Sequence, residues 1–245
     1  PSVAAVGTLL GNANRTTVPV PVPAGTAADE VVLVVIDNTS TIPTTLTPPA
    51  GFTLVPNSTY QTVDQPTQLR VYWKRCIGAD SGTYDFTFAT ANYCKAVAMR
   101  ISGVTTTGNP IDTDVAVGGN AATLTGLSLT TAVDNALLVW AANSWGTQTL
   151  TPPSGFASNV AYASSGGLAV GSVVQPTAGA TGTKTGTITG YSGWTEWMGA
   201  IKPAAASPVA FLLGDLLSIK QKPTGTPAAS AGIKISLVLL IDQNV

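Results

Sequence analysis

The chain has 245 residues, of which 11 are Lys or Arg, 12 are Asp or Glu and none is His, so its formal net charge is −1. The absence of His excludes a Ser-His-Asp or Cys-His nucleophile, a His-ligated metal and a His proton shuttle. The balanced charge argues against nucleic-acid binding through counterion release, and the 25 Gly and 17 Pro are typical of short strands joined by tight turns.

The N-terminus, Pro1-Ser2-Val3, has neither the charged segment nor the apolar segment of a secretory signal peptide, although a processed secreted chain would look the same. The most apolar stretches, residues 31–36 and 237–241, are far shorter than the roughly 18 residues of a membrane helix. Cys76 and Cys94 are too few for a disulfide framework and are expected to be two buried free thiols or a single bridge. We therefore expect a soluble chain made in a reducing cytoplasm, without membrane insertion.

Strand patterns run through most of the sequence. Residues 31–36 are apolar at every position, which predicts a strand covered on both faces. Residues 69–74 and 83–88 are rich in β-branched and aromatic side chains, and the turn residues 78–82 between them predict a hairpin with a five-residue loop. The best helical candidate, residues 209–219, is preceded by Pro and interrupted by Gly. The sequence therefore predicts an all-β fold.

An internal repeat divides the chain. The segment Thr-Leu-Thr-Pro-Pro-Ala-Gly-Phe at residues 45–52 recurs at residues 149–156 with one Ala/Ser exchange. Upstream of each copy, an acidic turn leads into an apolar strand, at residues 28–35 and 133–140. Because Pro-Pro ends strand pairing and Gly allows a tight bend, each copy is interpreted as a structural corner whose Phe anchors the next strand in the core.

The period of the repeat suits one pseudo-symmetric β-sandwich or two similar small ones. We predict a jelly-roll-like β-sandwich over residues 1–204, with pseudo-repeat halves at about 15–104 and 120–204, followed by a C-terminal extension.

The order of these motifs resembles a known family. An acidic turn and apolar strand at residues 22–35, Thr-Pro-Pro-Ala-Gly-Phe at 47–52, Val-Tyr-Trp-Lys and Gly-Thr-Tyr-Asp-Phe-Thr within 71–87, and Trp-Met followed by Ile-Lys-Pro at 197–203 carry the resemblance. The chain resembles, over about residues 15–204, the β-sandwich domains of tailed-bacteriophage virion proteins of the minor tail or structural type. The resemblance implies a structural role and brings no catalytic motif with it.

The composition of the sequence changes after residue 204. Two Pro-containing linkers, at residues 204–208 and 222–227, separate two apolar segments, and the last of these predicts a terminal β-strand in a C-terminal arm of residues 205–245. A bare apolar edge strand would aggregate, so we expect it to pair within its own sandwich or, preferably, with a neighbouring subunit. The candidate subunit contacts are Phe211, Leu212, Leu213, Ile233, Ile235, Leu237, Leu239 and Ile241.

The Asp and Glu residues give little indication of a catalytic or metal-binding site. Glu30 and Glu196 are the only glutamates, and nothing in their spacing makes them face one cleft as a glycosidase requires. Asp112 and Asp114 could offer oxygens to Ca²⁺ but lack further acidic ligands, so a solvated turn is favoured. We expect no catalytic residue, cofactor or metal site.

Tryptophans supply the remaining candidates. Trp140 and Trp197 fall within apolar strands and are expected in the core, whereas Trp145 and Trp194 lie beside turn residues and are candidates for stacking on a sugar ring.

Taken together, these features predict a non-enzymatic structural component of a tailed-bacteriophage virion, made in the host bacterial cytoplasm. A minor tail or tail-tip protein is the first hypothesis, with copies of itself and other virion proteins as partners and no nucleic acid. A capsid decoration protein is the alternative, and a carbohydrate-binding module that recognises a host surface glycan is the second alternative.

Overall fold

The structure is a computed structural model that describes residues 1–39, 44–62 and 65–205. The predicted C-terminal arm, apart from residue 205, lies outside the described residues, and so do its candidate subunit contacts, Phe211, Leu212, Leu213, Ile233, Ile235, Leu237, Leu239 and Ile241. In the described part of the chain the fold is all-β, with one 3₁₀ turn (η1, Pro56–Ser58) and no α-helix, which confirms the predicted fold class. The jelly-roll connectivity and the domain boundaries stay predictions.

Sixteen strands are present in the described residues. Those of the first half are β1 (Ser2–Val6), β2 (Leu10–Pro21), β3 (Val31–Asn38), β4 (Leu46–Thr47), β5 (Thr53–Leu54), β6 (Gln68–Arg75) and β7 (Thr83–Ser102). Those of the second half are β8 (Ile111–Ala121), β9 (Thr130–Thr131), β10 (Ala136–Ser144), β11 (Leu150–Thr151), β12 (Ala157–Tyr162), β13 (Gly167–Gln175), β14 (Gly179–Ala180), β15 (Thr187–Ile188) and β16 (Ser192–Ile201).

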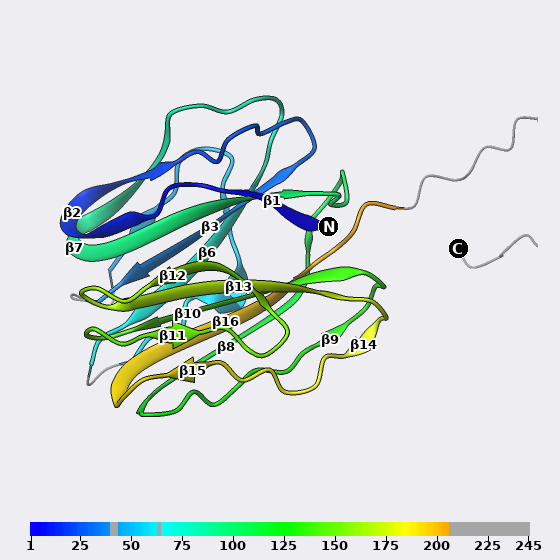
Figure 1. Cartoon of the computed structure of the whole chain (residues 1–245). Helices are drawn as coiled ribbons and strands as arrows, with labels where there is room; N and C mark the ends of the chain where they lie inside the picture. The colour runs from blue at the N-terminus through cyan, green and yellow to red at the C-terminus, as the bar shows by residue number, and fades with distance from the viewer. Residues whose placement is uncertain (40–43, 63–64, 206–245) are drawn as a thin grey trace, which may run out of the picture. The chain divides into compact units, whose positions relative to one another are not determined.

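Each half forms its own antiparallel sheet. The first sheet has the order β1-β7-β3-β6-β5, with β2 and β4 also paired to β7, and the second has the order β12-β13-β10-β16-β8. The order of strands is therefore equivalent, with β3, β6 and β7 matching β10, β13 and β16. Figure 1 shows the two sheets stacked as the layers of a sandwich.

The pairing register is equivalent as well. Leu46 of β4 lies opposite Phe88 of β7, and Leu150 of β11 lies opposite Ile188 of β15. The second pair follows the first by 104 and 100 residues. The first number is the offset of the Thr-Pro-Pro segment, and the second is the offset between the Gly-Thr pairs at residues 82–83 and 182–183. In the first half the single long strand β7 pairs with both β4 and β3. In the second half the corresponding pairings are made by two strands, β15 with β11 and β16 with β10.

The predicted hairpin at residues 78–82 is wrong. β6 and β7 do not pair with each other; both pair with β3, which lies between them, so they run parallel to one another. The apolar β3 takes the central position because both of its faces can be covered there, and the turn residues connect strands on either side of it.

Three apolar clusters hold the sandwich together, and β3 shows how they arise. Successive side chains of a strand point to opposite faces. The odd-numbered side chains from Val31 to Val35 pack in a central core shared with the second sheet, and the even-numbered ones from Val32 to Ile36 pack in an outer core of the first half. This burial of residues 31–36 on both faces was predicted and is confirmed.

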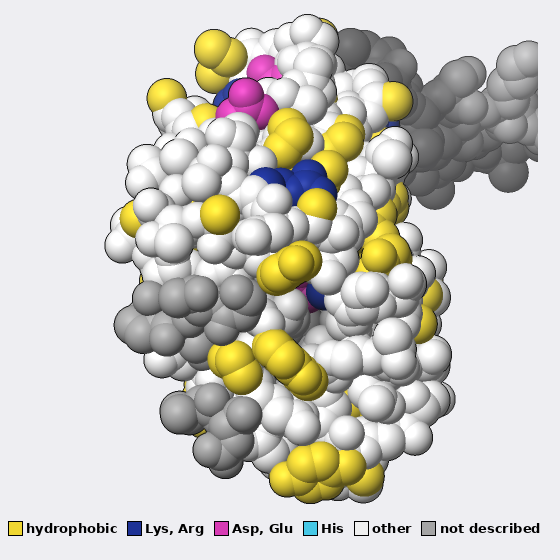
Figure 2. Space-filling view, turned by 90° about the vertical axis from the view of Figure 1, so that its left-hand side faces the viewer, with side chains coloured by type: hydrophobic (Ala, Val, Ile, Leu, Met, Phe, Trp, Pro, Cys, Tyr) yellow, Lys and Arg dark blue, Asp and Glu magenta, His cyan; other side chains and the backbone are white. Residues whose placement is uncertain are grey.

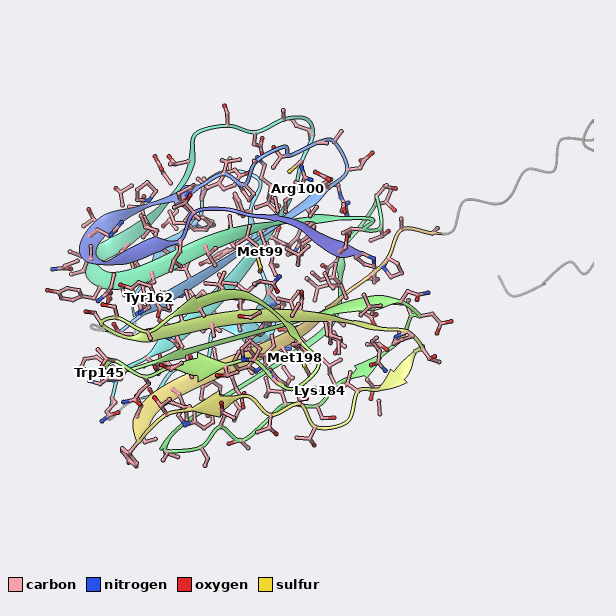
Figure 3. The ribbon with its side chains drawn as sticks, viewed as in Figure 1. Met99, Arg100, Trp145, Tyr162, Lys184 and Met198 are labelled. Carbon is pink, nitrogen blue, oxygen red and sulfur yellow. The ribbon has the colours of Figure 1, made fainter. Side chains whose placement is uncertain are left out.

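The second sheet repeats this arrangement. Odd-numbered residues of β10, from Leu137 to Ala141, lie in the central core, while even-numbered residues such as Trp140 lie in a third, outer core. Figure 3 shows Met99 between the two layers and Met198 within the second one. A fully buried Val, Leu or Ile contributes about 1.5–3 kcal/mol, so the central core is the main force that joins the halves.

Each copy of the Thr-Pro-Pro segment forms the same tight corner. Gly51 and Gly155 have φ values of 86° and 85°, in the left-handed region that glycine adopts without strain. In both corners the backbone N–H of the following Phe, Phe52 or Phe156, donates to the carbonyl oxygen three residues before it, at 3.3 and 3.1 Å. Both rings pack on the outer core of their own half, as predicted.

Candidate functional site

A cleft of about 380 Å³ opens where the two sheets meet at one end of the sandwich. Both halves line it, through β2, β7 and the residue after β3 on one side, and through the residues after β10 and the β12–β13 turn on the other. Figure 2 looks at this end and shows hydrophobic side chains around a hollow, with a patch of Lys or Arg atoms above it and a few Lys or Arg and Asp or Glu atoms visible inside it. The described residues that line it are Asn12, Thr39, Tyr93, Trp145, Gly146 and Ser165.

The cleft is the outer end of a polar gradient along the sheet interface. Val35 of β3 lies opposite Val97 of β7 in the central core, and Asp37 lies opposite Lys95 two positions further along. One more such step leads to Thr39 and Tyr93 of the cleft, where the Thr39 N–H donates to the Tyr93 carbonyl oxygen. Along β3 and β7, the interface between the sheets therefore changes from an apolar core at Val35 to a buried ion pair at Asp37 and then to an open cleft at Thr39.

The second sheet follows the same order. Ala141 pairs with Trp197 in the central core, Asn143 pairs with Thr195 at the level of the ion pair, and Trp145 follows at the level of the cleft. Asp37 and Lys95 lie six residues along from the Val31–Ile101 pair, and Asn143 and Thr195 lie six residues along from the Leu137–Ile201 pair. The corresponding positions in the pairing register therefore carry a carboxylate and an ammonium in the first sheet and an amide and a hydroxyl in the second.

The ion pair behind the cleft is buried. Lys95 Nζ lies 2.7 Å from Asp37 Oδ2, and both side chains are 0% exposed. The backbone N–H of Lys95 donates to Asp37 Oδ1 at 2.8 Å, and Asn143 also hydrogen-bonds the carboxyl group. Burial raises the pKa of Asp37, and Lys95 opposes this shift. The Lys95 ammonium also lies 6.0 Å from the centre of the Tyr162 ring.

Trp145 is the predicted sugar-contact residue that does reach the surface. Its side chain is 38% exposed, and Figure 3 shows it at the end of the second layer, near Tyr162. Its backbone is fixed on both sides: the N–H donates to Gly193 O at 2.8 Å, and the Ser192 hydroxyl donates to Trp145 O at 2.5 Å. The indole is therefore presented from a rigid position.

The second predicted contact, Trp194, is not at the surface, so the prediction of a surface position for it is wrong. Its side chain is 2% exposed and lies in the outer core of the second half. The indole packs against Gly119 of β8, where a Cβ atom would come within 3.1 Å of Cζ2. A turn residue next to a Trp does not show whether the Trp side chain points to the solvent or to the core from the strand that follows the turn. Trp140 and Trp197 are fully buried, as predicted.

Sequence reasoning missed Tyr93 as a cleft residue. Its ring is 48% exposed although it lies within the long strand β7. A Tyr next to Cys in a strand-like run has the pattern of a core residue, and only its place at the end of the sheet interface exposes it.

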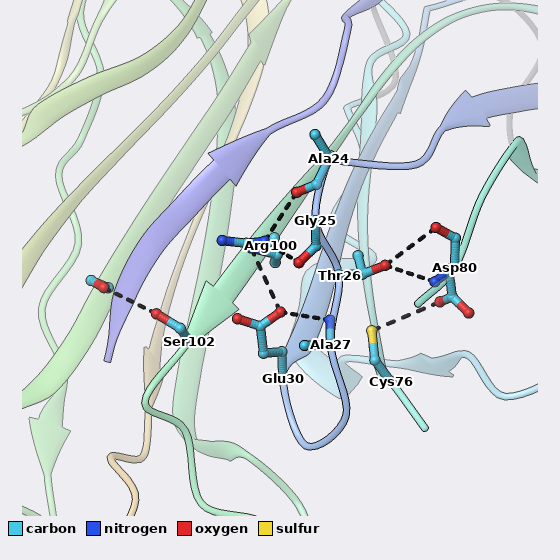
Figure 4. Close-up of polar contacts among 10 residues, drawn as sticks. Ala24, Gly25, Thr26, Ala27, Glu30, Cys76, Asp80, Arg100 and Ser102 are labelled. Atoms are coloured by element: carbon cyan, nitrogen blue, oxygen red, sulfur yellow. Dashed lines mark hydrogen bonds and ion pairs between the residues drawn. The ribbon is translucent and has the colours of Figure 1, made fainter. Parts of the chain in front are cut away.

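The carboxylates weighed from the sequence serve separate structural contacts. Glu196 Oε1 accepts the Gly126 N–H at 2.8 Å and Oε2 accepts the Trp140 indole N–H at 3.2 Å, within the second outer core. Burial raises the pKa of Glu196, and these hydrogen bonds oppose the shift. Glu30 instead closes the turn before β3, where Oε2 accepts the Ala27 N–H at 2.9 Å and lies 3.6 Å from Arg100 Nε (Figure 4).

Asp112 and Asp114, the candidate Ca²⁺ ligands, also accept hydrogen bonds from N–H groups of the protein. Asp112 Oδ2 accepts the Ala132 N–H at 2.7 Å, and Asp114 Oδ2 accepts the Asn57 N–H and the Trp197 indole N–H at 3.1 and 3.2 Å. Among residues 1–39, 44–62 and 65–205, no group of three or more Cys, Asp or Glu side chains is arranged to hold a metal ion.

Both cysteines are free, buried thiols, which settles the alternative left open by the sequence. Burial raises the pKa of Cys76 to about 11 and that of Cys94 to about 12. In the part of the chain that the structure describes, no helix has the length and apolar character needed to cross a membrane.

No family model matches the chain, and neither the curated proteins nor the solved structures contain a match to it.

Proposed function

We propose that this protein is a non-enzymatic structural component of a tailed-bacteriophage virion, a minor tail or tail-tip protein that acts through self-assembly and subunit contacts. The observation that carries the proposal is the doubled sandwich: two halves with one strand order and one pairing register, joined through a shared apolar core. Such a body is a rigid building block. The resemblance of the sequence motifs to those of virion β-sandwich domains is the reason for placing this building block in a phage particle.

The environment of the ionisable groups supports a structural role. Asp37 is paired with Lys95 inside the sheet interface, and Glu196 accepts two protein N–H groups in an outer core. A catalytic acid or base must instead reach a substrate proton. The buried charges therefore serve the fold.

The sheet edges offer sites for contact with other subunits. In the described residues, β8 and β12 end the second sheet and each pairs with a strand on one side only. An unpaired edge presents backbone donors and acceptors to another chain. Copies of this protein and other virion proteins are the partners that this proposal requires.

Immunogold electron microscopy of purified virions tests the proposal. Particles from a culture that expresses the chain are labelled with an antibody raised against residues 1–245, and mass spectrometry of the same particles checks for its peptides. Label on the tail or tail tip supports the proposal. Absence of the protein from the particles would overturn it.

A capsid decoration protein is the alternative within the same class, and regular gold label over the head would select it. A carbohydrate-binding module is the second alternative, and it is favoured by one specific observation: two exposed aromatic rings, Tyr93 and Trp145, line the same cleft.

A further inference from the structure

We infer that the cleft at the end of the sheet interface binds a neutral oligosaccharide. The inference does not depend on a place in a virion, because it concerns only the chemistry of the six lining residues. The cleft volume of about 380 Å³ falls within the roughly 300–1,000 Å³ of small-molecule sites.

The aromatic rings supply the stacking surface. Tyr93 and Trp145 come from different halves and leave 48% and 38% of their side chains exposed, where aromatic residues usually bury most of theirs. The C–H groups on the apolar face of a sugar ring carry partial positive charge, which suits the negative face of an aromatic ring. Two rings in one cleft can hold two neighbouring faces of an oligosaccharide.

The other lining groups suit sugar hydroxyls. Asn12 offers an amide, and Thr39 and Ser165 offer hydroxyls, so the cleft holds both donors and acceptors. Asn12 Oδ1 has no hydrogen-bond partner in the described part of the chain. Turning this amide towards a ligand would therefore break no hydrogen bond at that oxygen.

Charge selects the ligand class. None of the six lining residues is charged, and the buried Asp37–Lys95 pair behind them is closed on itself at 2.7 Å. A phosphate, a nucleotide or an acidic sugar would lose its hydration here, and none of these six residues offers it an ionic partner. A neutral glycan loses less hydration free energy on entering the cleft, and its hydroxyl groups can hydrogen-bond the amide and hydroxyl groups of the lining.

The backbone that carries the Trp145 ring of the cleft is also held in place. The Trp145 backbone is hydrogen-bonded at both its N–H and its carbonyl oxygen, and Gly146 beside it takes φ of 69°, a conformation that suits glycine. A ring held in place loses little conformational entropy on binding.

A glycan array followed by titration calorimetry tests the inference. The full chain is applied to immobilised neutral and acidic oligosaccharides, and the best neutral compound is titrated in solution. We expect a dissociation constant on the order of 1 mM or tighter, and at least a tenfold loss in each of Tyr93→Ala and Trp145→Ala. Tyr191→Ala is the matched control, since Tyr191 is 65% exposed and does not line the cleft.

A second readout needs no variant. Trp145 is the most exposed of the five tryptophans, since Trp73 is half-buried and the other three are buried, so a bound sugar should reduce quenching of the wild-type fluorescence by acrylamide. The inference is overturned if no neutral glycan binds, if binding is confined to acidic glycans, or if sugar leaves the quenching unchanged. None of these outcomes bears on immunogold labelling of the virion, so the two proposals fail separately.

Discussion

Replacing Lys95 with Met should strongly destabilise the protein, because it removes the cation that pairs with the fully buried carboxylate of Asp37. Asp37 and Lys95 are both 0% exposed and lie 2.7 Å apart. Breaking a buried pair by removing one partner costs about 3–5 kcal/mol. At roughly 2–4 °C per kcal/mol for a domain of this size, the thermal midpoint should fall by roughly 6–20 °C.

The double variant separates the cost of the unpaired charge from the value of the pair. In Asp37→Asn with Lys95→Met, the amide oxygen can still accept the backbone N–H of residue 95, and no buried charge remains. We expect the double variant to be within about 2 kcal/mol of the wild type, which gives a coupling energy well above the about 0.5 kcal/mol of independent sites.

The pH dependence of the single variant has a definite sign. Burial already raises the pKa of Asp37, and loss of Lys95 removes the main opposing effect. A carboxyl group whose pKa is raised in the folded state is neutral below its ordinary pKa, and there it does not destabilise the fold. The loss of stability grows as the pH rises from the ordinary pKa towards the folded-state pKa and is constant above it. The loss of stability in Lys95→Met should therefore be smaller at pH 4 than at pH 8.

Urea unfolding followed by circular dichroism at both pH values measures these free energies. Lys184→Met is the matched control, since Lys184 forms no ion pair among the described residues, and it should change stability by about 0.5 kcal/mol or less. The reasoning is refuted if Lys95→Met costs under 1 kcal/mol at pH 8, or if the double variant is as unstable as the sum of the singles.

Three further predictions concern the repeat corners and the other buried groups. Gly51→Ala and Gly155→Ala should each cost about 1–2 kcal/mol in urea unfolding, and nearly the same amount, because both have φ near 85° and an added Cβ would meet nothing closer than 3.6 Å; clearly unequal costs would contradict the equivalence of the corners. The stability advantage of the wild type over Glu196→Gln should shrink as the pH rises from 4 to 7, because the raised pKa of Glu196 favours the neutral form in the folded state; an advantage that grows with pH would contradict the direction of this shift. Cys76 and Cys94 should not react with a thiol reagent at pH 8 until guanidinium unfolds the chain, because burial raises their pKa values to about 11 and about 12; rapid labelling of the native protein would contradict their burial.

Local patterns determined a large part of this fold. The both-face burial of residues 31–36 follows from an uninterrupted apolar run, and the two corners follow from Pro-Pro-x-Gly-Phe, because the chemistry that sets each feature lies within a few residues. The same holds for the all-β class, since alternation and turn residues recur along the described chain.

Tertiary structure alone decided the features that join distant residues. The turn residues 78–82 predict a hairpin, but β3 lies between β6 and β7, because strands compete for the covered centre of the sheet and the most apolar strand takes it. Trp194 is buried because the register of its strand turns the side chain into the outer core of the second half, and Tyr93 is exposed because it lies at the end of the sheet interface; local spacing leaves both open. Asp37 and Lys95 are 58 residues apart, and the cleft beyond them gathers residues from 12 to 165. Their meeting depends on the packing of one sheet on the other, which the apolar central core enforces.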